Sequence, residues 1–191
     1  MKTRTYILFS ILLLQVGSIV SQCNGGGLFL TANDFKNKIA THCSNHTHIK
    51  HHEVFKRDII EVKTKDSTYK YKKKDIYGYR ENNGATYRLY NDKPYHIINP
   101  NETILIYKVS NGPSTKEQEQ TFSYYFSKDA SQEIKALTLN DLENTFKGDK
   151  MFEELLEIHF RKDNELLEYD NMHKMYKLNR LLELAKEGKL N

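Results

Sequence analysis

Hydrophobic and polar residues alternate through the middle of the chain, between residues 54 and 127. Ile60 and Val62 fall on one side of such an alternation, and Ile59 falls on the other. A period of two is typical of half-buried β-strands, and clusters of Asn, Asp, Gly and Pro separate the runs. The run Asn82-Asn83-Gly84 is a strong hairpin signal, because asparagine and glycine tolerate positive φ. We therefore predict about six or seven short strands in this region.

The hydrophobic period changes to that of a helix after residue 138. One predicted helical face carries residues at i, i+3, i+4 and i+7, namely Phe152, Leu155, Leu156 and His159. A second apolar stripe spans residues 172–182. The pattern predicts about three helices within residues 138–187.

Strands that precede a separate run of helices are typical of the α+β class. We predict a bent antiparallel sheet or a small β-barrel, followed by about three C-terminal helices packed on one side. Residues 28–191 contain no linker long enough to divide them, so we expect a single domain. The glycine-rich residues 23–27 are predicted to form a flexible mature N-terminus.

Residues 1–22 have the pattern of a secretory signal peptide. Two early cations, Lys2 and Arg4, precede an apolar run from Tyr6 to Val20. That run is shorter than the ~20 residues that a bilayer-spanning helix needs. We therefore expect an exported protein, whether periplasmic, surface-associated or secreted, with no transmembrane span after removal of the signal.

The charge balance argues against a nucleic-acid partner. The full chain carries a formal net charge of +4, and the mature chain loses Lys2 and Arg4 with the signal. A chain this close to neutrality lacks the basic surface that binds phosphate backbones. The sequence identifies no other partner.

The chain has two cysteines, Cys23 and Cys43. In an exported protein a disulfide is the simplest interpretation, and it would close a loop of about 20 residues worth about 3 kcal/mol. A second interpretation is a lipid anchor on Cys23, because an apolar and a small residue precede it as in bacterial lipoproteins. Gln22 is too large for the last position of that pattern. Two unpaired thiols are the third interpretation.

A histidine-rich segment, residues 42–53, offers candidate metal ligands. Its five histidines are His42, His46, His48, His51 and His52. Neutral imidazoles bind Zn, Cu and Ni, but the segment lacks the second histidine of the H-E-x-x-H motif. The competing interpretation is an exposed polar loop that needs no cofactor.

Tyrosines are concentrated in the predicted strands, among lysines and arginines. Aromatic rings interleaved with cations can stack on ligand rings. Tyrosine is also a favoured strand residue that packs its ring and leaves its hydroxyl in water. Both interpretations remain open from the sequence.

Several blocks of the chain resemble a family of uncharacterised small secreted proteins of Bacteroidota-type bacteria. The resemblance covers most of the chain from Gly27 to Ala185. Its blocks are Gly27–Phe35, Asp75–Arg80, Gly84–Arg88, Thr103–Lys108, Tyr124–Ser127 and His173–Asn179. The resemblance implies an exported α+β protein and no particular activity.

The sequence contains neither the G-x-S-x-G motif of a catalytic serine nor a glycine-rich phosphate loop. We therefore expect a non-enzymatic binding or structural protein of the cell envelope or exterior. The alternative is a metal-binding envelope protein that uses residues 42–53. An envelope hydrolase is a third class, for which no acid, base and nucleophile set can be assigned.

Mass spectrometry of native, tag-free protein from its own host tests these expectations together. We expect a lipid-free chain that begins near Gln22 and is two hydrogen atoms lighter than its reduced form, because the disulfide interpretation requires both. A lipid-sized increment on a chain beginning at Cys23 would instead establish an anchor. A metal ion retained in the native spectrum would support the metal-binding alternative.

Overall fold

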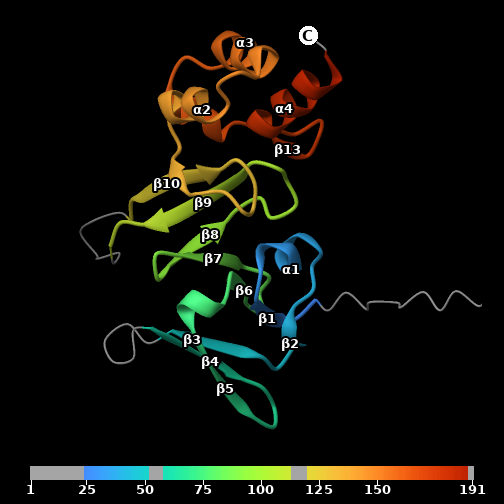
Figure 1. The fold of residues 1–191 in the computed structure, drawn as a ribbon, viewed down its shortest axis with the longest axis vertical. Helices are drawn as coiled ribbons and strands as arrows, with labels where there is room; N and C mark the ends of the chain where they lie inside the picture. Colours follow the sequence, from blue (N-terminus) through green and yellow to red (C-terminus); the bar gives the residue numbers. More distant parts are fainter. Residues whose placement is uncertain (1–23, 52–57, 113–119, 189–191) are drawn as a thin grey trace, which may run out of the picture.

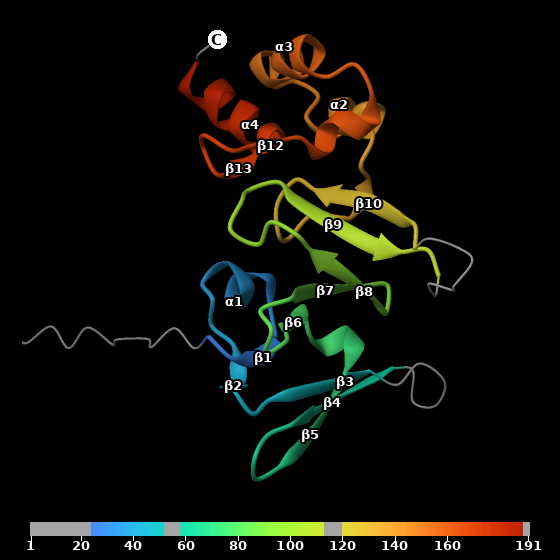
Figure 2. The ribbon, with the colours of Figure 1, turned by 180° about the vertical axis from the view of Figure 1, so that it is seen from behind.

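The computed structural model describes residues 24–51, 58–112 and 120–188. Three layers follow one another along the long axis of the molecule (Figures 1 and 2): a helical layer, an eight-stranded sheet and a three-stranded sheet. The α+β class predicted from the sequence is confirmed. Within the described part of the chain, no helix has the length and apolar character needed to cross a membrane.

The eight-stranded sheet is antiparallel throughout, with the order β11-β10-β9-β8-β7-β6-β1-β2. It is open, with β2 and β11 at its edges, so of the two predicted forms the sheet is found and the closed barrel is not. Its strands are β1 (Gly26–Phe29), β2 (Thr41–Ser44), β6 (Gly78–Arg80), β7 (Thr86–Tyr90), β8 (Lys93–Ile97), β9 (Leu105–Ser110), β10 (Phe122–Ser127) and β11 (Lys135–Ala136).

The smaller sheet consists of β3 (His48–His51), β4 (Ile59–Lys63) and β5 (Thr68–Lys72), in that order. Ile60 and Val62 of β4 are fully buried, as the alternation predicted. They pack with Leu28 and Leu89 of the large sheet. Burial of this apolar surface holds the two sheets together.

Three C-terminal α-helices cover β9 and β10. They are α2 (Leu139–Thr145), α3 (Lys150–His159) and α4 (Lys177–Glu187), with the short helix η2 (Asp163–Leu167) and the strands β12 (Tyr169–Asp170) and β13 (Met175–Tyr176) between α3 and α4. Phe152, Leu155 and Leu156 are completely buried, which confirms the predicted apolar face of α3. The second predicted stripe was too long: Met172 is 85% exposed in the turn between β12 and β13, and α4 begins only at Lys177.

The prediction of a flexible N-terminus at residues 23–27 is wrong for the residues that the structure describes. Gly26 and Gly27 belong to β1, which pairs with both β2 and β6. A Cβ on Gly27 would lie 3.0 Å from the Ala40 Cβ and 3.1 Å from the Thr41 carbonyl oxygen. These glycines allow close backbone packing rather than flexibility. Strands therefore start at Gly26 and not near residue 54.

The tight turns follow the predicted chemistry. Gly84 ends the Asn82–Gly84 turn between β6 and β7 with a φ of 89°. Asn91 and Asp92 also have positive φ, 49° and 62°, in the two-residue turn that joins β7 to β8. Positive φ at both central residues matches the right-handed twist of paired strands, so these turns set the register of the hairpins.

A buried arginine, Arg88, lies in the middle of the large sheet. It is 6% exposed, and its guanidinium lies 5.2 Å from the Tyr77 ring centre and 5.3 Å from that of Tyr90. One Nη donates a hydrogen bond to the Tyr107 hydroxyl at 3.1 Å. No carboxylate forms an ion pair with Arg88 among the described residues, so rings and a hydroxyl accommodate the charge.

The hydrogen bonds that lead from Arg88 through Tyr107 to Ser127 can each be assigned a donor and an acceptor. The Ser127 hydroxyl donates to the Asp129 backbone carbonyl at 2.7 Å, because a carbonyl can only accept. The Ser127 oxygen therefore accepts from the Tyr107 hydroxyl at 2.8 Å, and the Tyr107 oxygen accepts from Arg88. The hydrogen bonds from Arg88 through Tyr107 and Ser127 form a relay that connects β7, β9 and β10 across the sheet. Burial raises the pKa of the neighbouring Tyr77, and the Tyr107 hydroxyl raises it further.

On the opposite face of the sheet, aromatic rings form a row across neighbouring strands. The Tyr79 and Tyr87 rings are stacked at 4.9 Å, and the His96 ring lies 5.0 Å from that of Tyr87. Cross-strand ring pairs of this kind stabilise antiparallel sheets. These tyrosines therefore pack within the sheet, which is the second of the two interpretations left open by the sequence.

Substitution of Arg88 tests how its charge is accommodated. We expect Arg88→Lys to lower the free energy of unfolding by about 2 kcal/mol, because the ammonium stays charged but loses the planar stacking. Arg88→Met should cost less, because it removes the buried charge and keeps similar volume. Urea unfolding of both variants measures the difference. A larger loss for Arg88→Met would mean that the charge itself stabilises the sheet.

The pH dependence of stability tests the environment of His96. Burial, and next the Lys108 ammonium, lower the pKa of His96 below its usual 6.5, although Glu81 opposes this. The unfolded chain therefore binds a proton more readily, and stability is lost as the pH falls through 6.5 toward the lower folded pKa. We expect the urea midpoint to fall between about pH 7.5 and about pH 5.5, and to fall less in His96→Gln. His46→Gln, at an exposed turn, should keep the wild-type slope; an unchanged slope in His96→Gln would contradict the prediction.

Candidate functional site

The side chain of His42, a predicted metal ligand, contacts two tyrosines. It lies on β2, with its Nε2 atom 2.7 Å from the Tyr71 hydroxyl oxygen. Its ring is stacked on the Tyr69 ring at 3.8 Å. These contacts connect the edge of the large sheet to β5 of the small one. They also engage the Nε2 atom of His42 in a hydrogen bond with Tyr71.

The structure does not bring the other predicted histidines together with His42. His46 is exposed in the turn after β2, and His48 is exposed on β3. His51 stands three residues after His48 on the same strand, hence on the opposite face, with its ring 4.7 Å from that of Tyr79. His52 lies outside the described residues. Among the described residues, no three His, Cys, Asp or Glu side chains are grouped so as to hold a metal ion.

The two cysteines can be followed only in part. Cys43 lies on β2, 3.7 Å from one terminal nitrogen of Arg80. Cys23 lies outside the described residues, so the disulfide and the lipid anchor both stay predictions.

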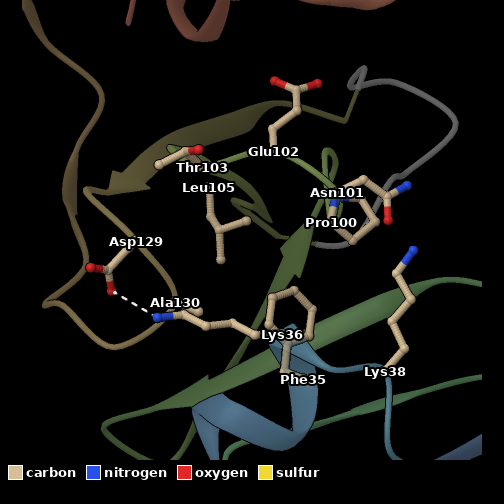
Figure 3. A pocket seen from close by; sticks show the side chains of 10 residues that line it. All are labelled: Phe35, Lys36, Lys38, Pro100, Asn101, Glu102, Thr103, Leu105, Asp129 and Ala130. Carbon is tan, nitrogen blue, oxygen red and sulfur yellow. Dashed lines mark ion pairs between the residues drawn. The ribbon is translucent and has the colours of Figure 1, made fainter. Parts of the chain in front are cut away.

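A groove lies between α1 (Ala32–Lys36) and the loop that joins β8 to β9 (Figure 3). Its first compartment has a volume of about 370 Å³. The residues that line it are Phe35, Lys36, Lys38, Pro100, Asn101, Glu102, Thr103, Leu105, Asp129 and Ala130. A second compartment of about 290 Å³ is lined by Asn24, Phe29, Phe35, Lys38, Arg80, Gly84, Thr86, Pro100 and Asn101. The two compartments share Phe35, Lys38, Pro100 and Asn101, so we treat them as one groove.

A capping box positions the wall formed by α1. The Thr31 side chain accepts a hydrogen bond from the Asp34 backbone at 3.1 Å, and the Asp34 carboxylate accepts from the Thr31 backbone at 2.9 Å. Phe35, 7% exposed, then packs edge-on against Phe29 at 5.5 Å. The capping box fixes where the helix begins and thereby where Phe35 enters the groove.

Two buried asparagines hold the opposite wall, the β8–β9 loop. The Asn99 side chain donates to the Ile104 carbonyl at 2.8 Å and accepts from the Ile106 backbone at 2.6 Å. Asn179 of α4 accepts from the Ile104 backbone at 2.8 Å and donates to its carbonyl at 2.9 Å. Asn99 therefore fixes the loop to the start of β9, and Asn179 fixes it to the helical layer.

The two carboxylates of the groove are engaged elsewhere. Glu102 points away from Phe35 in Figure 3. It accepts hydrogen bonds from the Asn99 side chain at 3.1 Å and from the Tyr176 backbone at 3.3 Å, and burial raises its pKa. Asp129 lies 3.9 Å from the Lys36 ammonium; burial raises its pKa, but hydrogen bonds from Ser131 outweigh this and leave the pKa lowered.

Lys38 is the cation that stays available in the groove. Among the residues that the structure describes, no carboxylate forms an ion pair with it. The described lining thus combines an apolar floor, one available ammonium group and two committed carboxylates. This combination suits the binding of a ligand better than acid–base chemistry.

No pattern in the sequence indicates this groove. Phe35 and Pro100, which both line it, lie far apart along the chain. The one local signal was the capping box at Thr31, which predicts a helix start and not a site. Comparisons with protein-family models, with curated proteins and with solved structures found no match to this chain.

Proposed function

We propose that this chain is an exported, non-enzymatic binding protein whose ligand site is the groove between α1 and the β8–β9 loop. The observation that carries the proposal is the groove itself, with buried Phe35 and Leu105 below and polar Lys38 and Asn101 at its mouth. A concave site that joins apolar surface to polar groups is the usual form of a small-molecule site.

The size of the groove supports this proposal. Its compartments, about 370 Å³ and 290 Å³, are at the lower end of the ~300–1,000 Å³ typical of ligand sites. Its walls are held by the capping box and by Asn99 and Asn179, so a ligand would enter a largely preformed site. A preformed site loses little conformational entropy on binding.

The non-enzymatic part of the proposal is supported by the chemistry of the lining. A nucleophile needs a neighbouring base, and general acid–base catalysis most often uses a carboxyl group or an imidazole. Glu102 and Asp129 are held by other groups, and the described lining contains neither cysteine nor histidine. Export is supported by the signal-like pattern of residues 1–22.

Obstruction of the groove tests the proposal. We expect Asn101→Trp to weaken saturable binding of the apolar dye anilinonaphthalene sulfonate by about tenfold or more, because Asn101 lies on both compartments. The wild-type chain contains no Trp, so indole emission in this variant also reports whether the ring enters the groove.

The matched control is Asn45→Trp, the same substitution at an exposed turn residue that does not line the groove. It should leave dye binding and thermal stability unchanged. Equal loss in both variants, or no saturable dye binding to the wild type, would contradict a ligand site in this groove.

A further inference from the structure

We infer that the groove takes an amphipathic monocarboxylate, with its carboxylate against Lys38 and its apolar body over Phe35 and Leu105. This inference rests on the proposed function and adds the chemical class of the ligand. It follows from charge, apolar surface and backbone conformation, which are taken in turn.

The charges around the groove leave one cation for a ligand. The Lys36 ammonium faces Asp129, at 3.9 Å (Figure 3). Arg80, in the second compartment, donates from its Nε atom to the Gly25 carbonyl at 3.0 Å. Lys38 has no such partner among the described residues. An ammonium group without such a partner suits one carboxylate, whereas phosphate groups are typically bound by several charged donors.

A neutral donor stands beside that charge. Asn101 lines the groove with an amide group, and in Figure 3 the Lys38 side chain extends toward it. Carboxylate oxygens accept hydrogen bonds from ammonium and amide groups alike. The Lys38 ammonium and the Asn101 amide therefore offer donors for the two oxygens of one carboxylate.

The floor of the groove provides the apolar surface. Phe35 is 7%, Leu105 1% and Ala130 3% exposed, and Pro100 forms part of the opposite wall. A hydrocarbon chain laid over this surface would be removed from water, which is favourable in proportion to the apolar area buried. A charged head at the mouth and an apolar floor together define an amphipathic ligand.

The backbone at Lys38 is an independent observation. Lys38 follows the C-cap Asn37 of α1 with a φ of 58°, the left-handed region in which glycine is usual. A residue with a side chain is less stable in this region than glycine, because its Cβ crowds the following carbonyl oxygen. The chain thus carries a lysine where helix termination alone favours glycine, and that lysine places its ammonium group at the groove.

Calorimetric titration with decanoate below its micelle concentration and with decanol below its solubility limit tests the inference. The two probes share an apolar chain and differ in charge. We expect decanoate to bind the wild-type protein about tenfold more tightly than decanol does. Lys38→Gln should reduce decanoate to the affinity of decanol and leave decanol unchanged.

Lys38→Gly separates binding from folding. It should remove the preference for decanoate while the melting temperature stays equal or rises, because it relieves the left-handed lysine. Lys147→Gln, at an exposed residue between α2 and α3, is the control for a general change in charge and should keep the preference.

The outcomes distinguish the inference from the proposed function. Equal binding of the two probes, abolished for both by Asn101→Trp, would overturn the carboxylate and keep the groove as a ligand site. A preference for decanoate that survives in Lys38→Gln would overturn the role of Lys38. Absence of binding by either probe, together with absence of saturable dye binding, would overturn both proposals.

Discussion

The fold depends on a positive charge that is buried without an ion-paired carboxylate among the residues that the structure describes. Arg88 lies between the Tyr77 and Tyr90 rings and donates to Tyr107, and the relay through Ser127 ends on the Asp129 carbonyl. Desolvating a guanidinium is unfavourable, so the rings and hydroxyls around it must keep fixed positions. This requirement connects the middle of the sheet, β7, to β9, β10 and the loop that begins at Lys128.

The same relay ends beside the groove. Ser127 is hydrogen-bonded to the backbone of Asp129, whose carboxylate faces Lys36. On the other wall, Asn99 and Asn179 join the β8–β9 loop to α4. The groove is thus built from loops, but each loop is held by a buried polar network. A binding site on loops keeps its shape when a rigid scaffold positions them in this way.

The sequence anticipated those parts of the fold that depend on near neighbours. The alternation around Ile60 and Val62, the face of α3 and the turn at Gly84 are all confirmed. It failed for Gly26–Phe29 and His48–His51, because glycine-rich and polar strands lack an apolar alternation. The sequence prediction also extended the last apolar stripe to Met172. The β12–β13 turn precedes α4, but the spacing of apolar residues does not change between them.

The candidate site, like the fold, could be predicted from the sequence only in part. Local spacing was enough to determine the α+β class, the turns, the helical faces and the histidine-rich composition of residues 42–53. Only the tertiary structure decided that His42 meets Tyr71, that His48 and His51 face opposite sides, and that Phe35 faces Pro100. Pairing of strands distant in sequence brings these groups together, and no periodicity within one segment encodes which distant segment it will contact.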